Sequence, residues 1–523
     1  MKASDRDMLH GPLLRPLLLF TLPIALSSMI QQLFNAADTA VVGYFGDRHA
    51  LAAVGANTEI VALIVTVSSG LAVGANLLIA RQIGQGKTGD QPAAVRTALL
   101  LAAVIGVIGL LAGQAAAAPP LRLMRTPEEV IGAASLYLHI YMLGYPFLPL
   151  YDFGAAVLRA RGDSRYLFFA LLLSGAVNVG LNLIFVAGLH MGVAGVAAAT
   201  GLSTAFAALA LIRRLAGEGR GTSPRKPLFS PRMAGDMLKI GVTFAVQGAV
   251  FCLANLFVQT AVNRFGETAM AGSTVAINFE YFTYYILTSF GQTTATFTAQ
   301  NYAAGQIKRC RRILRLCLGA SAVCSAVPIF TIVLFRDFFS GLFTPDPAVA
   351  AGAAVRILGI LLFEPLCSLY EVPAGVLRGS GHALYPAVST VLGTCVFRIV
   401  WIYTVFRAFP TLPTLYAAFP LSWILTALLC GAGFLILCPL KDTTRHGNTR
   451  KKSPHTDSLC RPYAGFAFTG VSPLVFTGSV PLLRARADRS YFSVRSPASR
   501  YCAAAPTWWA AICRRPRAGS ATG

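Results

Sequence analysis

The sequence predicts an all-α polytopic membrane protein whose twelve transmembrane helices form two six-helix bundles related by an internal parallel repeat. Three observations predict this fold. Of the 523 residues, 55% are hydrophobic and only 12% are charged, whereas a soluble domain has about 25% charged residues. Apolar runs of about 20 residues, long enough to cross a bilayer, recur along most of the chain. Motifs of the first half return in the second half at a nearly constant offset.

The apolar runs define the expected spans. They lie near residues 17–43, 54–80, 96–117, 132–158, 166–188, 192–213, 239–262, 269–301, 313–335, 349–377, 384–407 and 413–438. Loops after even-numbered spans carry 19 Lys and Arg residues, and loops after odd-numbered spans carry six. Since cytoplasmic loops are rich in Lys and Arg, we expect a multi-pass protein of the cell inner (plasma) membrane with both termini cytoplasmic. The polar N-terminal segment lacks a small-residue cleavage site, so we expect no removable signal peptide.

The span order predicts four segments. Residues 1–216 form an N-terminal six-helix bundle, 217–231 a cytoplasmic linker loop, 232–440 a C-terminal six-helix bundle, and 441–523 a basic tail. The tail supplies +11 of the net charge of +23. We expect it to be disordered on the cytoplasmic membrane surface, where basic residues meet anionic lipid. A thirteenth span at 463–483 is the alternative, but its prolines and glycines argue against it.

The two halves carry matching motifs at an offset of 219 or 220 residues. The pairs are "FGD" at Phe45 with "FGE" at Phe265, "ARQIGQGK" at Ala80 with "AQNYAAGQ" at Ala299, Pro146 with Pro365, and "AAVLRARGD" at Ala155 with "AGVLRGSGH" at Ala374. Six spans in each half give the copies the same orientation, which is a parallel repeat about an axis along the membrane normal. Two such bundles can enclose a cavity and rock about it. A duplication kept only for packing is the alternative.

Polar side chains of three spans predict a pocket in the first bundle. They are Gln31, Asn35 and Asp38 of the first span, Ser174, Asn178 and Asn182 of the fifth, and Thr200, Ser203 and Thr204 of the sixth. Spacings of three and four residues put most of each group on one helix face. An ionised Asp at a helix centre costs roughly 2.5–3.5 kcal/mol. One acidic oxygen and several neutral ones could hold Na⁺, with Asp38 and Asn178 as ligands, or a proton. Alternatively, Asp38 only forms hydrogen bonds to neighbouring helices.

The eighth span carries a polar stripe with a spacing of four residues. Its members are Glu280, Tyr284, Thr288, Gln292, Thr296 and Gln300. Since the stripe winds by about 40° per step, it would line a tilted, wet surface. We expect Gln31 and the first four members to line a substrate cavity, where Tyr281 and Tyr285 add aromatic area suited to planar cations. Polar contacts that only hold helices together are the alternative.

Other ionisable residues lie in or near the spans. Glu364, Glu371, Arg356, Arg398 and Asp152 are candidates for structural ion pairs whose partners the sequence leaves open. Arg159 and Arg378 lie in the matching "LR" pairs at helix ends, where we expect them to reach the membrane surface by snorkelling. Eleven cysteines without a CxxC pair predict neither a disulfide framework nor a structural metal site. The nucleotide-binding GxxxxGK[ST] motif and the hydrolytic HExxH and GxSxG motifs are absent. We therefore expect neither an enzyme nor a cofactor beyond a coupling ion.

Several motifs together resemble one known family. "LPIALSSMIQQLFNAADTAVVGYFG", "ARQIGQGK", "LGYPFLPLYDFGAAVLRARGD", "NVGLNLIFV" and "TFTAQNYAAG" look like the multidrug and toxic compound extrusion (MATE) transporters, and most closely like the bacterial DNA-damage-inducible branch. The resemblance covers about residues 12–438. It implies a two-lobed antiporter that expels cationic or amphipathic compounds in exchange for Na⁺ or H⁺.

The resemblance also implies roles for single residues. Asp38 corresponds to the acid of the family's first helix, Asn178 to its fifth-helix Asn, and Thr200 to its sixth-helix Thr. Asn182 stands where many members have a second acid, which leaves the coupling ion open and gives more weight to Asp38. The seventh span has no acid where another branch carries a Glu. Glu280 of the eighth span is therefore the best candidate for a functional acid in the second lobe.

These features favour a secondary antiporter that binds small cationic or amphipathic substrates within the lipid bilayer, binds no nucleic acid and is a monomer. The alternative is a lipid-linked oligosaccharide flippase of the same superfamily. A flippase typically has extra spans and a strongly cationic cavity, whereas the cavity candidates here are acidic and neutral. An ion channel or a membrane enzyme is a more distant alternative.

Overall fold

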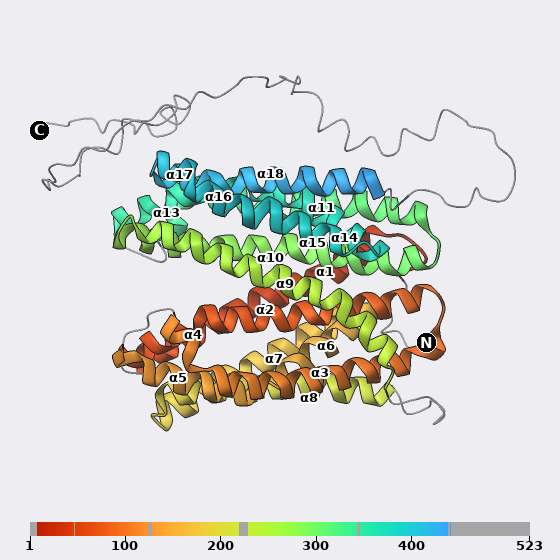
Figure 1. Ribbon diagram of the computed structural model, residues 1–523, viewed down its shortest axis with the longest axis horizontal. Helices are drawn as coiled ribbons and strands as arrows, with labels where there is room; N and C mark the ends of the chain where they lie inside the picture. Colours follow the sequence, from red (N-terminus) through yellow and green to blue (C-terminus); the bar gives the residue numbers. More distant parts are fainter. Residues whose placement is uncertain are drawn as a thin grey trace, which may run out of the picture. The chain divides into compact units, whose positions relative to one another are not determined.

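The computed structural model describes residues 8–45, 48–123, 128–218, 229–341, 346–437 and 440 (Figure 1). These residues form helices and short connections, with no strand among them. Most of the expected linker and all of the expected tail lie outside the described residues, as does the side chain of Asn35. The predictions made for them stay predictions.

The described residues of the first half of the chain form eight α-helices. They are α1 (Leu14–Phe45), α2 (Arg48–Gly84), α3 (Gln91–Ala116), α4 (Ala118–Leu123), α5 (Glu128–Gly144), α6 (Phe147–Ala160), α7 (Ser164–Asn182) and α8 (Gly192–Glu218). A short 3₁₀ turn, η1 (Thr88–Asp90), precedes α3, and a π-helical segment, η2 (Leu183–Gly188), follows α7.

The second half follows the same plan with more interruptions. Its helices are α9 (Pro231–Asn263), α10 (Glu267–Ala303), α11 (Ile307–Leu334), α12 (Arg336–Gly341), α13 (Pro347–Gly359), α14 (Ser368–Ser380), α15 (Leu384–Thr390), α16 (Phe397–Tyr403), α17 (Val405–Ala408) and α18 (Leu412–Leu437). The 3₁₀ segment η3 (Leu361–Cys367) joins α13 to α14, and the π-helical segment η4 (Val391–Val396) joins α15 to α16.

Each of the twelve expected spans coincides with one helix or one interrupted helix. By length and composition, ten helical segments of the described chain can cross a membrane, and the bent pair α5–α6 makes an eleventh. The remaining expected span is α10, which is long enough at 37 residues but carries the polar stripe. The sequence thus predicted the all-helical fold correctly.

Two of the spans are broken at equivalent places in the repeat. The fourth span bends by 47° between α5 and α6, where Pro146 lies. The tenth span changes to a 3₁₀ segment around Pro365. Proline has no N–H to donate and its ring clashes with the preceding turn, which explains both breaks.

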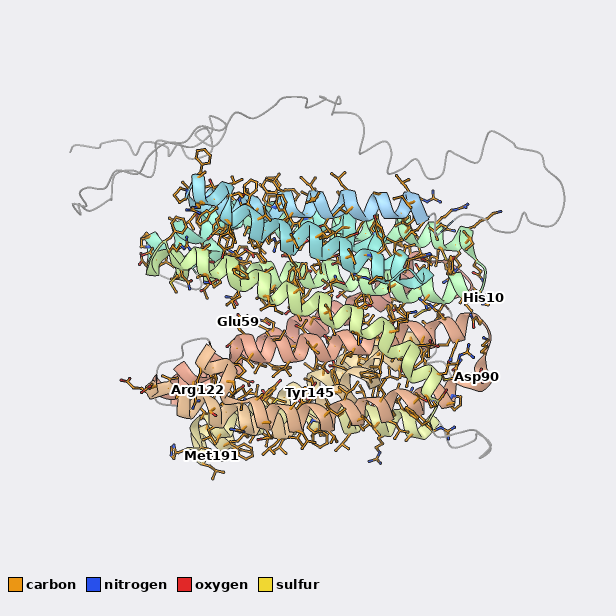
Figure 2. All side chains as sticks on the ribbon, in the orientation of Figure 1. His10, Glu59, Asp90, Arg122, Tyr145 and Met191 are labelled. Carbon is orange, nitrogen blue, oxygen red and sulfur yellow. The ribbon has the colours of Figure 1, made fainter. Side chains whose placement is uncertain are left out.

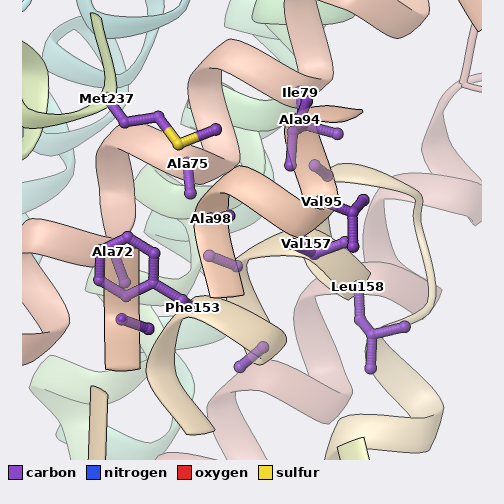
Figure 3. Close-up of a cluster of buried hydrophobic side chains, with 14 of the residues drawn as sticks. Ala72, Ala75, Ile79, Ala94, Val95, Ala98, Phe153, Val157, Leu158 and Met237 are labelled. Atoms are coloured by element: carbon purple, nitrogen blue, oxygen red, sulfur yellow. The ribbon is translucent and has the colours of Figure 1, made fainter. Parts of the chain in front are cut away.

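The core of the first bundle is built from small side chains. Ala72, Ala75, Ala98 and Phe153 are buried in a cluster shared by α2, α3 and α6 (Figure 3). Small residues let helix backbones approach closely, and the resulting van der Waals packing is one of the forces that associate helices in a membrane.

Two equivalent helices, α1 and α9, each pack against both halves of the chain. Near its start, α1 buries Leu17 and Phe20 against residues of α10 and α11. Further along, Phe34 lies against Gly175 of α7, where a Cβ atom would come within 1.6 Å of its ring. In the same way, α9 begins with Met237 in the core of the first bundle and ends with Val262 in a core of the second. Both helices therefore connect the two bundles.

The bundles meet along the second halves of α2 and α10 and the first half of α9, which crosses towards α2 in Figure 1. A Cβ atom on Gly74 would lie 1.9 Å from the carbonyl oxygen of Met237, and one on Gly241 would lie 2.3 Å from that of Leu71. In contrast, the first half of α2 exposes Glu59, and the first half of α10 exposes Tyr281. The close contact between the two bundles is thus concentrated at the end where α2 and α10 finish.

Candidate functional site

Asp38 of α1 meets side chains of α7 and α8. The Asn182 amide donates a hydrogen bond to Oδ1 of Asp38 at 2.5 Å and a weaker one to Oδ1 of Asn178 at 3.3 Å. The Thr200 hydroxyl lies 3.4 Å from Oδ2 of Asp38, but its shorter contact, 2.9 Å, is to the carbonyl oxygen of Val196. The structure therefore brings together four of the five predicted ion-coupling residues. The fifth, Asn35, has no described side chain.

Local helix geometry positions this group. Asn178 and Asn182 lie one turn apart on the same face of α7, and both are buried. The π-helical segment η2 begins directly after Asn182, and such wide turns are frequent at functional sites. Gln31 lies two turns before Asp38 on α1 and is exposed.

The site holds an acid with neutral partners only. In the described part of the chain, no Lys or Arg contacts Asp38, which is half-buried. Oδ1 of Asn182 is buried and has no hydrogen-bond partner. A cavity of about 10 Å³ lies beside Thr200, lined by Tyr141 and Thr204 among others. Carboxylate, amide and hydroxyl oxygens, one of them unsatisfied, suit a hard cation or a proton.

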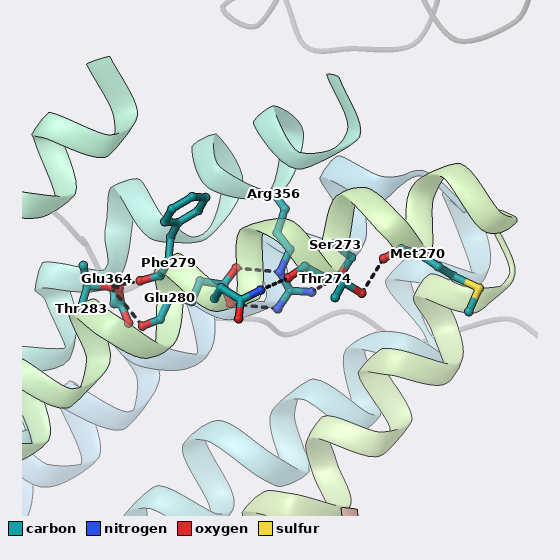
Figure 4. Close-up of polar contacts among 9 residues, drawn as sticks. Met270, Ser273, Thr274, Phe279, Glu280, Thr283, Arg356 and Glu364 are labelled. Carbon is teal, nitrogen blue, oxygen red and sulfur yellow. Dashed lines mark hydrogen bonds and ion pairs between the residues drawn. The ribbon is translucent and has the colours of Figure 1, made fainter. Parts of the chain in front are cut away.

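The acid at the start of the polar stripe is paired. Both carboxylate oxygens of Glu280 accept hydrogen bonds from Arg356, at 2.6 Å from Nε and 2.8 Å from Nη2 (Figure 4). The remaining guanidinium nitrogen of Arg356 donates to Ser273 at 2.7 Å. Because the pair is largely buried and bidentate, the carboxylate of Glu280 is not free to bind another cation in this structure.

The stripe divides into two parts. Thr288 donates to backbone carbonyls of its own helix, Tyr284 is half-buried, and Gln292 is exposed. Further along, Thr296 donates to Oδ1 of Asn76 at 3.1 Å and Gln300 donates to the carbonyl oxygen of Ala160 at 2.6 Å. For Thr296 and Gln300 the structure supports the alternative interpretation, in which polar contacts join helices.

The structure also pairs several of the remaining ionisable residues. Glu371 lies 3.6 Å from Arg378, so the expectation that Arg378 snorkels to the surface was wrong: its guanidinium is buried over the ring of Phe244. Asp152 accepts a hydrogen bond from Ser68 at 2.6 Å.

Two further ionisable side chains of the second bundle are held without an ion pair. Glu364 accepts a hydrogen bond from Thr283. Arg398 donates to Ser422 and lies 3.9 Å from the ring of Phe419. Both are buried.

Sequence reasoning missed one acid. Glu59 lies in the second span, where no functional residue was expected, and it is exposed on α2. The signal that could have identified Glu59 is the same as for Asp38. Each is a single carboxylate in an apolar run, where an acid is energetically costly and usually functional.

Comparison with known proteins identifies the chain's relatives. The family MatE matches twice, at residues 23–184 and 244–404, one copy in each half. The chain is 26% identical to the probable multidrug resistance protein YoeA of Bacillus subtilis over 72% of its length and 83% of the relative's. It is also 26% identical to the multidrug resistance protein PmpM of Pseudomonas aeruginosa, over 70% and 78% of the two lengths.

Solved structures share the fold. One is described as the outward-facing conformation of a multidrug resistance MATE family transporter; it has a TM-score of 0.78 at 22% identity and covers 85% of this chain and all of its own. Another is a MOP superfamily transporter from Pyrococcus furiosus, with a TM-score of 0.77 at 22% identity, covering 85% of this chain and 99% of its own. The assignment to the DNA-damage-inducible branch stays a prediction. The chain belongs to the MatE family, and it is therefore a multi-pass membrane transporter rather than an enzyme.

Proposed function

We propose that this protein is a secondary active antiporter that exports cationic or amphipathic drugs and toxic compounds in exchange for Na⁺ or H⁺. The multidrug resistance relatives support the substrate class. One observation carries the coupling role: the carboxylate of Asp38 is held by Asn182 and Thr200 without a Lys or Arg among its described contacts.

The contrast between the bundles supports Asp38, rather than an acid of the second bundle, as the residue that binds the coupling ion. Glu280 pairs with Arg356 and Glu371 pairs with Arg378. An acid that already has a buried cation beside it gains little from binding another one. Asp38 lacks such a partner, so a mobile cation or a proton can neutralise its charge. Asp38 and Asn178 would be the first ligands of Na⁺, and the unsatisfied oxygen of Asn182 is available as a third.

The coupling step follows from this chemistry. Binding of a cation or proton at Asp38 replaces or weakens the hydrogen bonds that Asp38 accepts from Asn182 on α7 and Thr200 on α8. Because α1 also packs against α10 and α11, a change at Asp38 can reach the second bundle through one continuous helix. Ion binding on the outward side would then favour release of the drug, and ion release to the cytoplasm would reset the cycle.

Rocking of the bundles about a central cavity completes the proposal. The Lys- and Arg-rich loops after even-numbered spans favour a cytoplasmic location for the end of α2 at Gly84 and of α10 at Ala303. The bundles meet towards this end, so this arrangement would be open to the outside. Both termini would be cytoplasmic, in the plasma membrane, and the transporter would act as a monomer.

The flippase alternative finds less support. The family relatives are multidrug resistance proteins, and buried Arg356 and Arg378 are both neutralised by acids. Arg398 is also buried and donates to Ser422 without an acid beside it, but one such arginine does not make a strongly cationic cavity.

Efflux of a fluorescent cationic dye from pump-deficient cells tests the proposal. Wild type is compared with Asp38→Asn, and the Na⁺ and H⁺ gradients are collapsed separately. We expect efflux that requires Asp38 and stops with one of the two gradients, which then identifies the ion. Asp337→Asn is the control, because Asp337 is 89% exposed at its side chain. Unchanged efflux by well-inserted Asp38→Asn would refute the coupling role.

A further inference from the structure

A groove lies where α1 and α11 begin, away from Asp38. It has a volume of about 450 Å³, which is within the range of small-molecule sites, about 300–1,000 Å³. Its walls combine leucines of the first turns of α1 with two arginines, Arg15 of α1 and Arg312 in the second turn of α11. The groove therefore has an apolar part and a cationic part.

The groove lies at one end of the helices. Figure 2 shows His10, just before α1, at the same end of the molecule as Asp90, which follows α2, whereas Arg122 and Met191 lie at the other end. The loops at the His10 end are the ones rich in Lys and Arg. The arginines of the groove are thus placed at a membrane surface, and basic pockets between helices at such a surface bind anionic lipid head groups.

Hydrogen bonds hold the chain before α1 in place. The guanidinium of Arg309 donates to the carbonyl oxygens of Gly11, at 2.8 Å, and of His10, at 3.0 Å. The amide of Asn301 donates to the carbonyl oxygen of Met8 at 3.1 Å. These bonds tie the segment that leads into α1 to the end of α10 and the start of α11.

Apolar packing fixes the two walls of the groove against each other. Leu13 and Leu17 are buried in one cluster with Ile313 and Cys317 of α11. Since the same stretch of α1 carries Arg15 and the same stretch of α11 carries Arg312, the two guanidinium groups are held beside one space before any ligand arrives. Such a preformed site loses little conformational entropy on binding.

The arginines of the groove have no partner of their own. Arg15 and Arg312 are exposed, and in the described part of the chain neither side chain forms a hydrogen bond or an ion pair. Exposed Lys308 and Arg315 lie on the same face of α11 as Arg312. Guanidinium groups match the oxygens of a phosphate with two parallel hydrogen bonds. A single phosphate between Arg15 and Arg312 would compensate both charges.

The apolar wall continues from the groove along α1. Leu14, Leu18, Leu22 and Leu26 are exposed and follow each other at a spacing of four residues, so they form one row on the helix surface. The row is about 18 Å long at 1.5 Å per residue. One leaflet of the hydrocarbon core is about 15 Å deep, half of about 30 Å. The row therefore matches the length of an acyl chain in one leaflet.

We propose that this groove binds one anionic phospholipid, with its phosphate between Arg15 and Arg312 and an acyl chain along the leucines of α1. The segment from residue 441 onward cannot fill the groove as well, because its net charge of +11 is repelled by the two arginines. A lipid bound here would brace the start of α1, the helix that carries Asp38, against α11. The inference goes beyond the proposed export function and does not depend on it.

Native mass spectrometry of the purified full chain counts single bound lipids and tests the proposal. The protein is titrated in detergent with dioleoyl phosphatidylglycerol, which is anionic, or with dioleoyl phosphatidylcholine, which has the same chains and no net charge. For wild type we expect a lower Kd for the first phosphatidylglycerol. Arg15→Gln and Arg312→Gln should each raise this Kd about fivefold, and together about 25-fold, as expected for basic residues at a membrane surface. Phosphatidylcholine should be affected clearly less.

Further variants make the test specific. Arg165→Gln is the matched control, because Arg165 is the second residue of α7 as Arg15 is of α1, and it is exposed and outside the groove; it should change neither Kd. Arg15→Lys and Arg312→Lys keep the charge and should retain most of the preference. Leu18→Gln interrupts the apolar wall and should weaken binding of both lipids. The thermal unfolding midpoint of each arginine variant without lipid should equal that of wild type.

Four outcomes would overturn the proposal. The first is an equal Kd of phosphatidylglycerol for wild type and the double variant, and the second is an equal loss in Arg165→Gln, which would indicate diffuse surface charge. The third is displacement of the lipid by an excess of inorganic phosphate, which would show a site for the free anion. The fourth is a dimer in the same spectra that disappears in the double variant, which would show that the groove pairs two copies of the chain. None of these outcomes depends on dye efflux, so the proposed function is tested separately.

Discussion

Asn76 of α2 and Thr296 of α10 hydrogen-bond to each other at 3.1 Å, and the offset of 219 residues between the two helices puts them one residue away from equivalent positions of the repeat. Nearly equivalent positions of two repeats can touch only near the axis that relates the repeats. The Asn76 amide also donates to the carbonyl oxygen of Ala156 at 3.1 Å, so the side chain of Asn76 is held in place by the first bundle. We infer that the axis relating the two bundles passes close to this pair.

Thr296→Val tests this contact. Valine keeps the shape and removes the hydroxyl, so Oδ1 of Asn76 loses its donor. Polar contacts between membrane helices contribute about 0.6 kcal/mol on average. Loss of this contact should therefore raise the population of the form in which the bundles separate at this end about threefold. The measurement is the alkylation rate of A299C, at a fully buried position nearby, in a cysteine-free background. Thr274→Val is the control, because Thr274 is exposed and bonds only within its helix; equal rates in all variants would contradict the prediction.

Gly241→Ala tests the close approach of α9 to α2. The added Cβ atom would lie 2.3 Å from the carbonyl oxygen of Leu71, so the helices must separate at this end. We expect loss of transport with normal expression and membrane insertion. Gly235→Ala is a matched control on the same helix, because nothing lies within 4 Å of its Cβ position. Full transport by Gly241→Ala would show that the contact is not needed.

Glu280→Gln tests whether Glu280 is structural. It leaves the buried guanidinium of Arg356 without its carboxylate, and breaking a buried pair in this way costs about 3–5 kcal/mol. We expect a clearly lower thermal unfolding midpoint in detergent. The double variant with Arg356→Gln should be more stable than Glu280→Gln alone. If Glu280→Gln kept its stability and lost only drug binding, Glu280 would belong to the substrate cavity as the sequence first suggested.

Asn182→Asp tests the composition of the coupling site. It places a second acid 2.5 Å from the position of Oδ1 of Asp38, where two close carboxylates favour binding of a proton or cation. We expect tighter binding of the coupling ion, seen as a larger thermal stabilisation by the ion that drives transport. Asn278→Asp is the control, since Asn278 is only half-buried and bonds only to its own helix. Equal ion dependence in both variants would argue against a role for position 182.

The sequence predicted much of the fold and part of the site, for physical reasons. Apolar runs located all twelve spans, since a bilayer demands long apolar helices. Helical spacing correctly grouped Asn178 with Asn182 on one face. The pairing of Glu280 with Arg356, 76 residues away, depends on how α10 packs against α13, which no local pattern contains. The crossing of α1 and α9 between the bundles was missed for the same reason.

The central claim is that Asp38 binds the coupling cation or proton, which the protein exchanges for the drug. Measuring the release of this ion when the drug binds tests the claim most directly. Purified protein is loaded with Na⁺ or protonated in a weakly buffered solution, a cationic dye is added, and released Na⁺ or H⁺ is measured with an electrode or a pH indicator. The account predicts release of one of the two ions by wild type. Asp38→Asn should release neither, while it still binds the dye. Equal release by Asp38→Asn and wild type would contradict the account.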